Sequence, residues 1–309
     1  MSTPQLSHDP LWPRTGAWPS VATLAADETA DLAIIGIPTW RTSLSATQAH
    51  TTPDAIRDAL PRYAGHVRGA NGASLVLDEA LRIVDAGNIT EPDAPSGEAN
   101  AIATVADLAT RARLIVALGG DNAATVPAAL GAYGSDLATA GLITFDAHHD
   151  LRDGTSNGSP VRRLVEAGLD GSRIVQIGIA DFANSIEYTQ RANELGITII
   201  HRDDVAERGM ANVVAEALSI AGAAGGPIHV DIDVDVCDRS IAPACPASLP
   251  GGFSAHELLS AARLVARDAR VRSVDLTEID ATTDAPDGRT IRLAALLVLQ
   301  IAAGLADRT

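Results

Sequence analysis

The chain has 309 residues, with 46% hydrophobic and 20% charged residues, which excludes wholesale disorder and allows one large domain or two ordinary ones. The formal net charge of −16 argues against a nucleic-acid partner or an anionic membrane surface. All 23 basic residues are arginine, and the absence of lysine excludes Schiff-base chemistry and a lysine-dependent phosphate loop.

In chain order, the predicted elements begin with an irregular arm over residues 1–25, followed by a single domain over residues 26–309. In the domain, short apolar runs rich in β-branched residues alternate with amphipathic stretches, which is typical of strand–helix units around a parallel sheet. The predicted strands are residues 32–37, 114–118, 141–145, 173–179, 197–200, 228–232 and 271–276. This order predicts a three-layer α/β fold.

Three of the predicted helices have recognisable boundaries. One begins with Thr52 as its cap and Pro53 in its first turn, a second follows Ser254, and the last covers about residues 290–303. Residues 88–100 contain Pro, Gly and Asp and are predicted to form a loop.

The start of the chain and its cysteines bear on where the protein works. The first 19 residues lack the basic and apolar regions of a signal peptide, and no apolar run approaches the ~18–20 residues of a membrane span. Cys237 and Cys245 are too few for a disulfide framework. We therefore expect a cytoplasmic protein without a membrane partner.

Polar clusters lie at the ends of four of the predicted strands. They are Gly119-Gly120-Asp121-Asn122, Asp146-Ala147-His148-His149-Asp150, Asp231-Ile232-Asp233-Val234-Asp235 and Glu278-Ile279-Asp280. Ligands of open parallel sheets bind at the carboxyl ends of the strands, so we expect these four clusters to contribute to one site.

The spacing within two of these clusters predicts a metal centre. Side chains two residues apart share one side of an extended backbone, which aligns Asp146, His148 and Asp150, and likewise Asp233 and Asp235. Two carboxylates about 4 Å apart repel by roughly 4 kcal/mol at an effective dielectric constant near 20, and the chain has no lysine to neutralise them. Oxygen ligands with one or two imidazoles favour Mn²⁺, and bridging carboxylates suggest two ions about 3.5–4 Å apart. Either motif alone is more often a helix cap, an Asx turn or a solvated loop.

The four clusters occur in the order that is found in the ureohydrolase (arginase/agmatinase/formimidoylglutamase) family. The resemblance includes residues 35–38 and 52–57 and covers about residues 30–305. It implies a three-layer αβα fold around a central, mostly parallel sheet of about eight strands, and a catalytic domain over residues 26–309. It also implies a dimanganese centre whose metal-bound hydroxide cleaves a C–N bond of a linear amidine or guanidine. The family is commonly oligomeric, which makes a homo-oligomer an expectation here too.

The resemblance assigns roles to individual residues. Asp146 and Asp233 resemble the carboxylates that bridge both ions, and Asp150 resembles a ligand of the first ion. His148 and Asp235 resemble ligands of the second ion.

Glu278 resembles the carboxylate that binds the cationic group of the substrate, because a planar, delocalised cation pairs well with a bidentate carboxylate. Asp150 and Glu278 are therefore the main catalytic candidates.

Two positions depart from the family pattern. Asn122 stands where the family has a histidine that completes the shell of the first ion, so we expect two Mn²⁺ per chain with the first site weakened. The loop at residues 156–160 lacks the histidine that is thought to shuttle protons in arginases and agmatinases. His149 is a catalytic candidate for that role, although strand alternation turns it away from the site, and the alternative is a packed or solvated histidine.

The loop after the second cluster bears on the substrate. Residues 150–153 followed by 157–162 resemble the formimidoylglutamase branch of the family. Arg152 is predicted to bind a substrate carboxylate, with an ion pair to Asp150 or Asp153 as the alternative. Asn157 is a second substrate-binding candidate.

These features predict a formimidoylglutamase. The alternatives are a guanidino hydrolase of the arginase, agmatinase or guanidinobutyrase type that releases urea, and a metal-binding family member without turnover.

Overall fold

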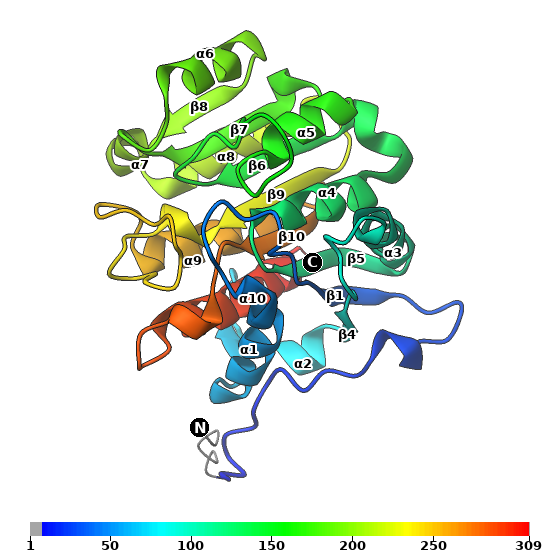
Figure 1. The fold of residues 1–309 in the computed structure, drawn as a ribbon. Helices are drawn as coiled ribbons and strands as arrows, with labels where there is room; N and C mark the ends of the chain where they lie inside the picture. The colour runs from blue at the N-terminus through cyan, green and yellow to red at the C-terminus, as the bar shows by residue number, and fades with distance from the viewer. Residues whose placement is uncertain (1–7, 309) are drawn as a thin grey trace.

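The structure is a computed structural model that describes residues 8–308. Its centre is an eight-stranded sheet in the order β4-β1-β5-β10-β9-β6-β7-β8 (Figure 1). All neighbouring strands of this sheet run parallel. Helices cover both faces, so the predicted αβα fold with about eight strands is confirmed.

The predicted strands agree with the structure to within two residues at each end. The strands of the sheet are β1 (Ala30–Ile37), β4 (Ile83–Asn88), β5 (Ala112–Gly119), β6 (Gly141–Phe145), β7 (Ile174–Ile179), β8 (Thr198–His201), β9 (Ile228–Asp233) and β10 (Val271–Thr277). The prediction missed β4, an edge strand that is buried only at its start. It also missed a short antiparallel hairpin formed by β2 (His66–Arg68) and β3 (Ser74–Val76).

The helices are α1 (Thr52–Ala59), α2 (Leu77–Ala80), α3 (Gly97–Arg111), α4 (Thr125–Tyr133), α5 (Pro160–Ala167), α6 (Ile186–Glu194), α7 (Arg202–Arg208), α8 (Met210–Ala221), α9 (Ala255–Ala266) and α10 (Arg289–Ala306). The helix predicted after Ser254 is confirmed as α9, where Ser254 and Glu257 form a capping box. The predicted loop at residues 88–100 ends early, because α3 begins at Gly97. Thr52 is not the cap of α1, since its hydroxyl donates to the Ile279 carbonyl at 2.5 Å.

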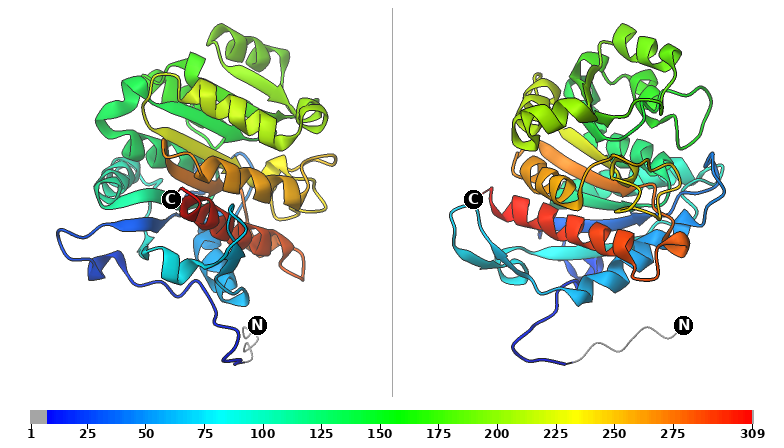
Figure 2. Two further views of the ribbon diagram at one scale, coloured as in Figure 1. Left: turned by 180° about the vertical axis from the view of Figure 1, so that it is seen from behind. Right: turned by 90° about the vertical axis from the view of Figure 1, so that its left-hand side faces the viewer.

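Alternate residues of the central strands pack into two separate hydrophobic clusters. Leu32 and Ile34 of β1 face the cluster that includes α1, α9 and α10, whereas Ala33 and Ile35 face the cluster that includes α3 and α4. Figure 2 shows α8, α9 and α10 together on one side of the sheet. Burial on both faces explains why these strands are apolar throughout.

Helix α10 lies within the first of these clusters. Among residues 8–308, it is the one helix that is long and apolar enough, by length and composition alone, to cross a membrane. Since 67% of it is buried in the fold, it has the character of a core helix. The expectation that no apolar segment approaches the length of a membrane span is thus corrected for α10.

The end of α10 is fixed by one buried carboxylate. Asp307, whose side chain is 3% exposed, accepts hydrogen bonds from Arg263, Arg267 and the Ala70 N–H group. Burial raises the pKa of Asp307, but the hydrogen bonds from these three donors outweigh it and hold the pKa below its ordinary value. The interaction joins α9, α10 and the β2–β3 turn.

We expect Asp307→Asn to lower the free energy of unfolding by about 2 kcal/mol at pH 7, because it removes charged hydrogen bonds. Since the pKa of Asp307 is lower in the folded chain than in the unfolded chain, its contribution is present above the unfolded pKa of about 3.9 and is lost as the pH falls through the folded pKa. The difference in the free energy of unfolding between the variant and the parent should therefore become smaller as the pH is lowered. Urea unfolding at several pH values measures it.

A matched control is Asp287→Asn, which removes an exposed ion pair with Arg289 and should leave stability almost unchanged. A loss of similar size in both variants, or a loss that persists undiminished in acid, would contradict the assignment.

Candidate metal centre and substrate cavity

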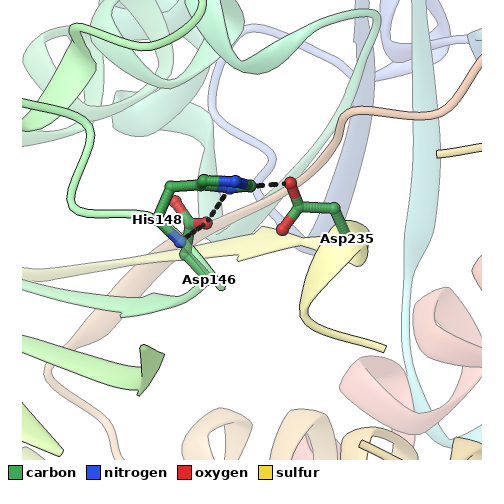
Figure 3. Close-up of side chains that lie close together, drawn as sticks. All are labelled: Asp146, His148 and Asp235. Atoms are coloured by element: carbon green, nitrogen blue, oxygen red, sulfur yellow. Dashed lines mark hydrogen bonds and ion pairs between the residues drawn. The ribbon is translucent and has the colours of Figure 1, made fainter. Parts of the chain in front are cut away.

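Three predicted metal ligands converge at the carboxyl ends of two neighbouring strands. Asp146 and His148 follow β6, and Asp235 follows β9 (Figure 3). Their potential ligand atoms all lie within 4.8 Å of one another. The His148 Nδ1 atom is 3.4 Å from Asp146 Oδ1 and 3.0 Å from Asp235 Oδ2. The two-residue spacing of Asp146 and His148 thus brings both side chains to one place.

The chemistry of this group fits a divalent cation. Asp146 Oδ2 is buried without a hydrogen-bond partner, and burial raises the pKa of Asp146 to about 6. Burial lowers the pKa of His148, but Asp235 and Asp146 outweigh burial and raise that pKa to about 12. The carboxylates therefore attract positive charge strongly, and an imidazole with buried carboxylate oxygens is a donor set that suits Mn²⁺.

Asp150 and Asp233 line a cavity beside the group of Asp146, His148 and Asp235, although neither belongs to that group. The cavity has a volume of about 400 Å³ and is also lined by His148, Asp235 and Glu278. Burial and neighbouring carboxylates raise the pKa values of both Asp150 and Asp233 well above their ordinary range. All five predicted acidic and imidazole ligands are thus found at one end of the sheet.

Asn122 does not offer its side-chain oxygen to this group. Its Oδ1 atom accepts hydrogen bonds from the hydroxyls of Thr125 at 2.6 Å and Thr277 at 3.0 Å. Its Nδ2 atom donates to Asp150 Oδ2 at 2.6 Å. The prediction that Asn122 is a weak metal ligand is therefore corrected, because in this arrangement it is a hydrogen-bond donor to a predicted ligand.

Glu278 is buried in the cavity wall and is held by two donors. Its Oε1 atom accepts from the Asn122 backbone N–H group at 2.9 Å and from Asn157 Nδ2 at 2.6 Å. Burial, with a contribution from Asp121, raises the pKa of Glu278 to about 8. Glu278 and Asp150 have φ angles of +62° and +53°, a region that non-glycine residues rarely adopt and that is characteristic of functional sites.

Arg152 and Asn157, the two predicted substrate-binding residues, line the cavity, and their contact with a substrate stays a prediction. The alternative ion pair of Arg152 with Asp150 or Asp153 is not formed, since Asp153 pairs with Arg191 at 2.8 Å instead. Asn157 links two walls, because its Nδ2 atom donates to Glu278 and its Oδ1 atom accepts from the Leu44 N–H group at 2.9 Å. Arg152 is thus left available to a ligand, while Asn157 supports the carboxylate beside it.

His149 lies outside this cavity. Its Nδ1 atom is 2.7 Å from Gln176 Oε1, its Nε2 atom is 3.2 Å from Thr189 Oγ1, and its side chain is buried. Burial lowers the pKa of His149. The predicted catalytic role of His149 is therefore corrected to the packed alternative.

One wall of the cavity is formed by residues that were not predicted from the sequence. Leu44, Ser45 and residues 183–185 line it, and Asn184 connects this wall to the predicted ligands. Asn184 Oδ1 accepts from the His149 N–H group at 2.9 Å, and its Nδ2 atom donates to the Ala147 carbonyl at 3.0 Å. The polar residues that follow β7 carried a signal for this wall, because they also lie at the carboxyl end of a strand.

Comparisons with known proteins agree with this geometry. The family model described as "Arginase family" matches residues 30–304. A formimidoylglutamase from Halalkalibacterium halodurans is 35% identical over 88% of this chain and 86% of its own. The crystal structure of formimidoylglutamase from Bacillus subtilis is 28% identical with a TM-score of 0.88, and covers 99% of this chain and 96% of that chain. A structure of Trypanosoma cruzi formiminoglutamase with Mn²⁺ shares the fold, at 24% identity and a TM-score of 0.81 over 91% of this chain and 95% of that chain. A conserved fold, a family match over nearly the whole chain and a carboxylate–imidazole group at the strand ends lead to one conclusion: the chain belongs to the arginase family.

Proposed function

We propose that the protein is a manganese-dependent hydrolase that cleaves a C–N bond in a linear amidine or guanidine, with N-formimidoyl-glutamate as its substrate. The observation that carries the proposal is the convergence of Asp146, His148 and Asp235 beside a cavity that also contains the buried Glu278. The similarity to formimidoylglutamases supports the choice of substrate. A cytoplasmic location and a homo-oligomer remain predictions.

Asp146, His148, Asp150, Asp233 and Asp235 are proposed to hold two Mn²⁺ ions, with Asp146 and Asp233 shared between them. A pair of such ions, when bound, activates water as a nucleophile near neutral pH and stabilises the charge that develops on the attacked group. The chain supplies the oxygen and imidazole donors for them, with the four carboxylates buried and the His148 side chain 26% exposed.

The cavity wall is proposed to bind and orient the substrate. Glu278 pairs with the amidinium group, and Asn157 holds the Glu278 carboxylate in place through its 2.6 Å hydrogen bond. A bound cation would offset the burial that raises the pKa of Glu278 and would keep that carboxylate ionised. Arg152 attracts a carboxylate at the far end of the substrate, and for the same reason it disfavours a purely cationic substrate.

Product analysis tests this proposal directly. The chain is depleted of metal with a chelator, reloaded with Mn²⁺, and incubated separately with formimidoylglutamate, arginine, agmatine and guanidinobutyrate. Formamide from formimidoylglutamate is the expected product. Urea from one of the other compounds would support the guanidino hydrolase instead. If two Mn²⁺ bind but no product forms from any of them, the chain is a family member without turnover.

We expect Arg152→Gln to raise KM for formimidoylglutamate by about 10-fold, because it removes a charged hydrogen bond to a carboxylate, while kcat changes little. Steady-state kinetics measure both constants. Arg289→Gln, which alters an exposed arginine paired with Asp287, is the control and should leave both constants unchanged. An unchanged KM in Arg152→Gln would contradict the proposed contact.

We expect Asn122→His to raise the affinity for the more weakly bound Mn²⁺ by on the order of tenfold, because an imidazole can ligate the ion whereas the Asn122 amide oxygen is directed at Thr125 and Thr277. Calorimetric titration of the metal-free chain measures the affinity and the number of ions bound. If the titration is the same as that of the parent, residue 122 does not face an ion even as histidine.

A further inference from the structure

The Asn122 side chain makes three of its four possible hydrogen bonds, all of them to groups of the chain itself. Both lone pairs of its Oδ1 atom are directed at hydroxyl donors, from Thr125 at 2.6 Å and from Thr277 at 3.0 Å. Its Nδ2 atom donates to Asp150 at 2.6 Å, and Asn122, Thr125 and Thr277 are all fully buried or nearly so. An amide with this set of partners has one favoured orientation.

The direction of the amide follows from what its partners can do. An Asp150 that binds a cation is ionised and can only accept, so in the metal-loaded chain the reversed amide would place two acceptors against each other in a buried site. The Thr277 hydroxyl has one proton and two acceptors in reach, Asn122 Oδ1 at 3.0 Å and Asp231 Oδ1 at 3.4 Å. The shorter contact directs that proton to Asn122.

Residue 122 also joins the two carboxylates that the proposed reaction uses. Its side chain binds Asp150, and its backbone N–H group donates to Glu278 Oε1 at 2.9 Å. Both of these carboxylates stand in the left-handed backbone region, which requires support from their surroundings. Thr277 directly precedes Glu278 at the end of β10, so its hydroxyl connects that strand to the start of η4 (Asn122–Ala124).

We propose that Thr277, assisted by Thr125, is a positioning residue that acts through Asn122. The two hydroxyls hold the Asn122 amide so that its Nδ2 atom donates to Asp150. This hydrogen bond keeps the Asp150 carboxylate on the metal side of the cavity, at a fixed position relative to Glu278. The proposal rests on the proposed function for the identity of the ions, but the orientation of Asn122 is a property of the metal-free chain.

The test compares Thr277→Val, which keeps the shape and removes the hydroxyl, with Thr277→Ser, which restores it. Thr144→Val is the matched control, because the Thr144 hydroxyl is equally buried, lies on the same sheet and has no hydrogen-bond partner among the described residues. Each full-length variant is measured by calorimetric Mn²⁺ titration, alone and in the Asn122→Ala background. In the metal-free chain, NMR measures solvent exchange of the Asn122 side-chain amide protons, which are assigned by their loss in Asn122→Ala.

Loss of one neutral hydrogen bond corresponds to a roughly 5-fold change in an equilibrium constant. We expect Thr277→Val to weaken Mn²⁺ binding by about 5-fold and to speed amide exchange by about as much, with Thr277→Ser close to the parent and Thr144→Val without effect. In the Asn122→Ala background, Thr277→Val should have no further effect on Mn²⁺ binding, because the residue through which it acts is gone.

An unchanged amide exchange rate in Thr277→Val would overturn the proposal, as would an equal loss of Mn²⁺ affinity with and without Asn122. Failure of the proposed function has a separate result, in which the parent chain releases no product from any amidine or guanidine. The amide exchange experiment still measures the effect of Thr277 in that case.

Discussion

Asp233→Ala is expected to remove both Mn²⁺ ions and to abolish hydrolysis. Asp233 is proposed to be shared between the ions, and its side chain lies in the cavity with Asp150 and Asp235. Loss of an outer partner of a metal ligand typically lowers metal affinity or activity by about 10–100-fold, and loss of a shared ligand should exceed this range. Metal analysis after dialysis and product release from formimidoylglutamate measure the two effects.

The control for this variant is Asp153→Asn, an exposed carboxylate on the loop that follows Asp150, paired with Arg191 outside the cavity. It should retain the metal content and activity of the parent. Retention of one ion at full affinity in Asp233→Ala would contradict the assignment of Asp233 to both metal sites.

Glu278→Gln is expected to lower kcat/KM by about 30- to 5000-fold, the range that corresponds to 2–5 kcal/mol for loss of one partner of a buried charge pair. Glutamine keeps the shape of the side chain and an oxygen that accepts the hydrogen bonds from Asn122 and Asn157. The variant therefore removes the charge that pairs with the amidinium group and leaves the wall intact. Steady-state kinetics and a parallel Mn²⁺ titration separate the two roles.

Metal content should be unchanged in Glu278→Gln, because Glu278 is assigned to the substrate and not to the ions. Glu216→Gln, on the outer surface of α8 and paired with Arg208, is the control and should leave kcat/KM unaltered. A variant at position 278 with parental kcat/KM would show that this carboxylate does not bind the reacting group.

The chain's strands were predictable because a parallel sheet that is covered on both faces requires long apolar, β-branched segments. Residues 141–145 and 228–230, for example, contain no Asp, Glu or Arg before the clusters that begin at Asp146 and Asp231. The edge strand β4 was missed for the same reason, since it is exposed along its second half and its sequence carries little apolar signal. The early start of α3 was hidden by Pro and Gly in the preceding turn.

The gathering of acidic side chains at one edge of the sheet was predictable from spacing, whereas their roles as ligands were assigned by the family resemblance and stay predictions. Asp146 and His148, like Asp233 and Asp235, stand two residues apart at the ends of strands, and neighbouring parallel strands bring such ends together. No long-range information was needed beyond the rule that ligands gather at one edge of the sheet.

Local sequence thus determined which segments become strands, which residue types stand at their ends, and hence that anionic oxygen atoms would be concentrated there. Tertiary structure alone decided how individual side chains are used: Asn122 turns its oxygen to Thr277, and His149 is packed against Gln176. The physical reason is the strand order, in which β10 lies beside β5 and β7 lies beside β6. Such non-local neighbours supply the hydrogen-bond partners, and hydrogen bonding of a buried polar group depends on the atoms beside it rather than on its position in the chain.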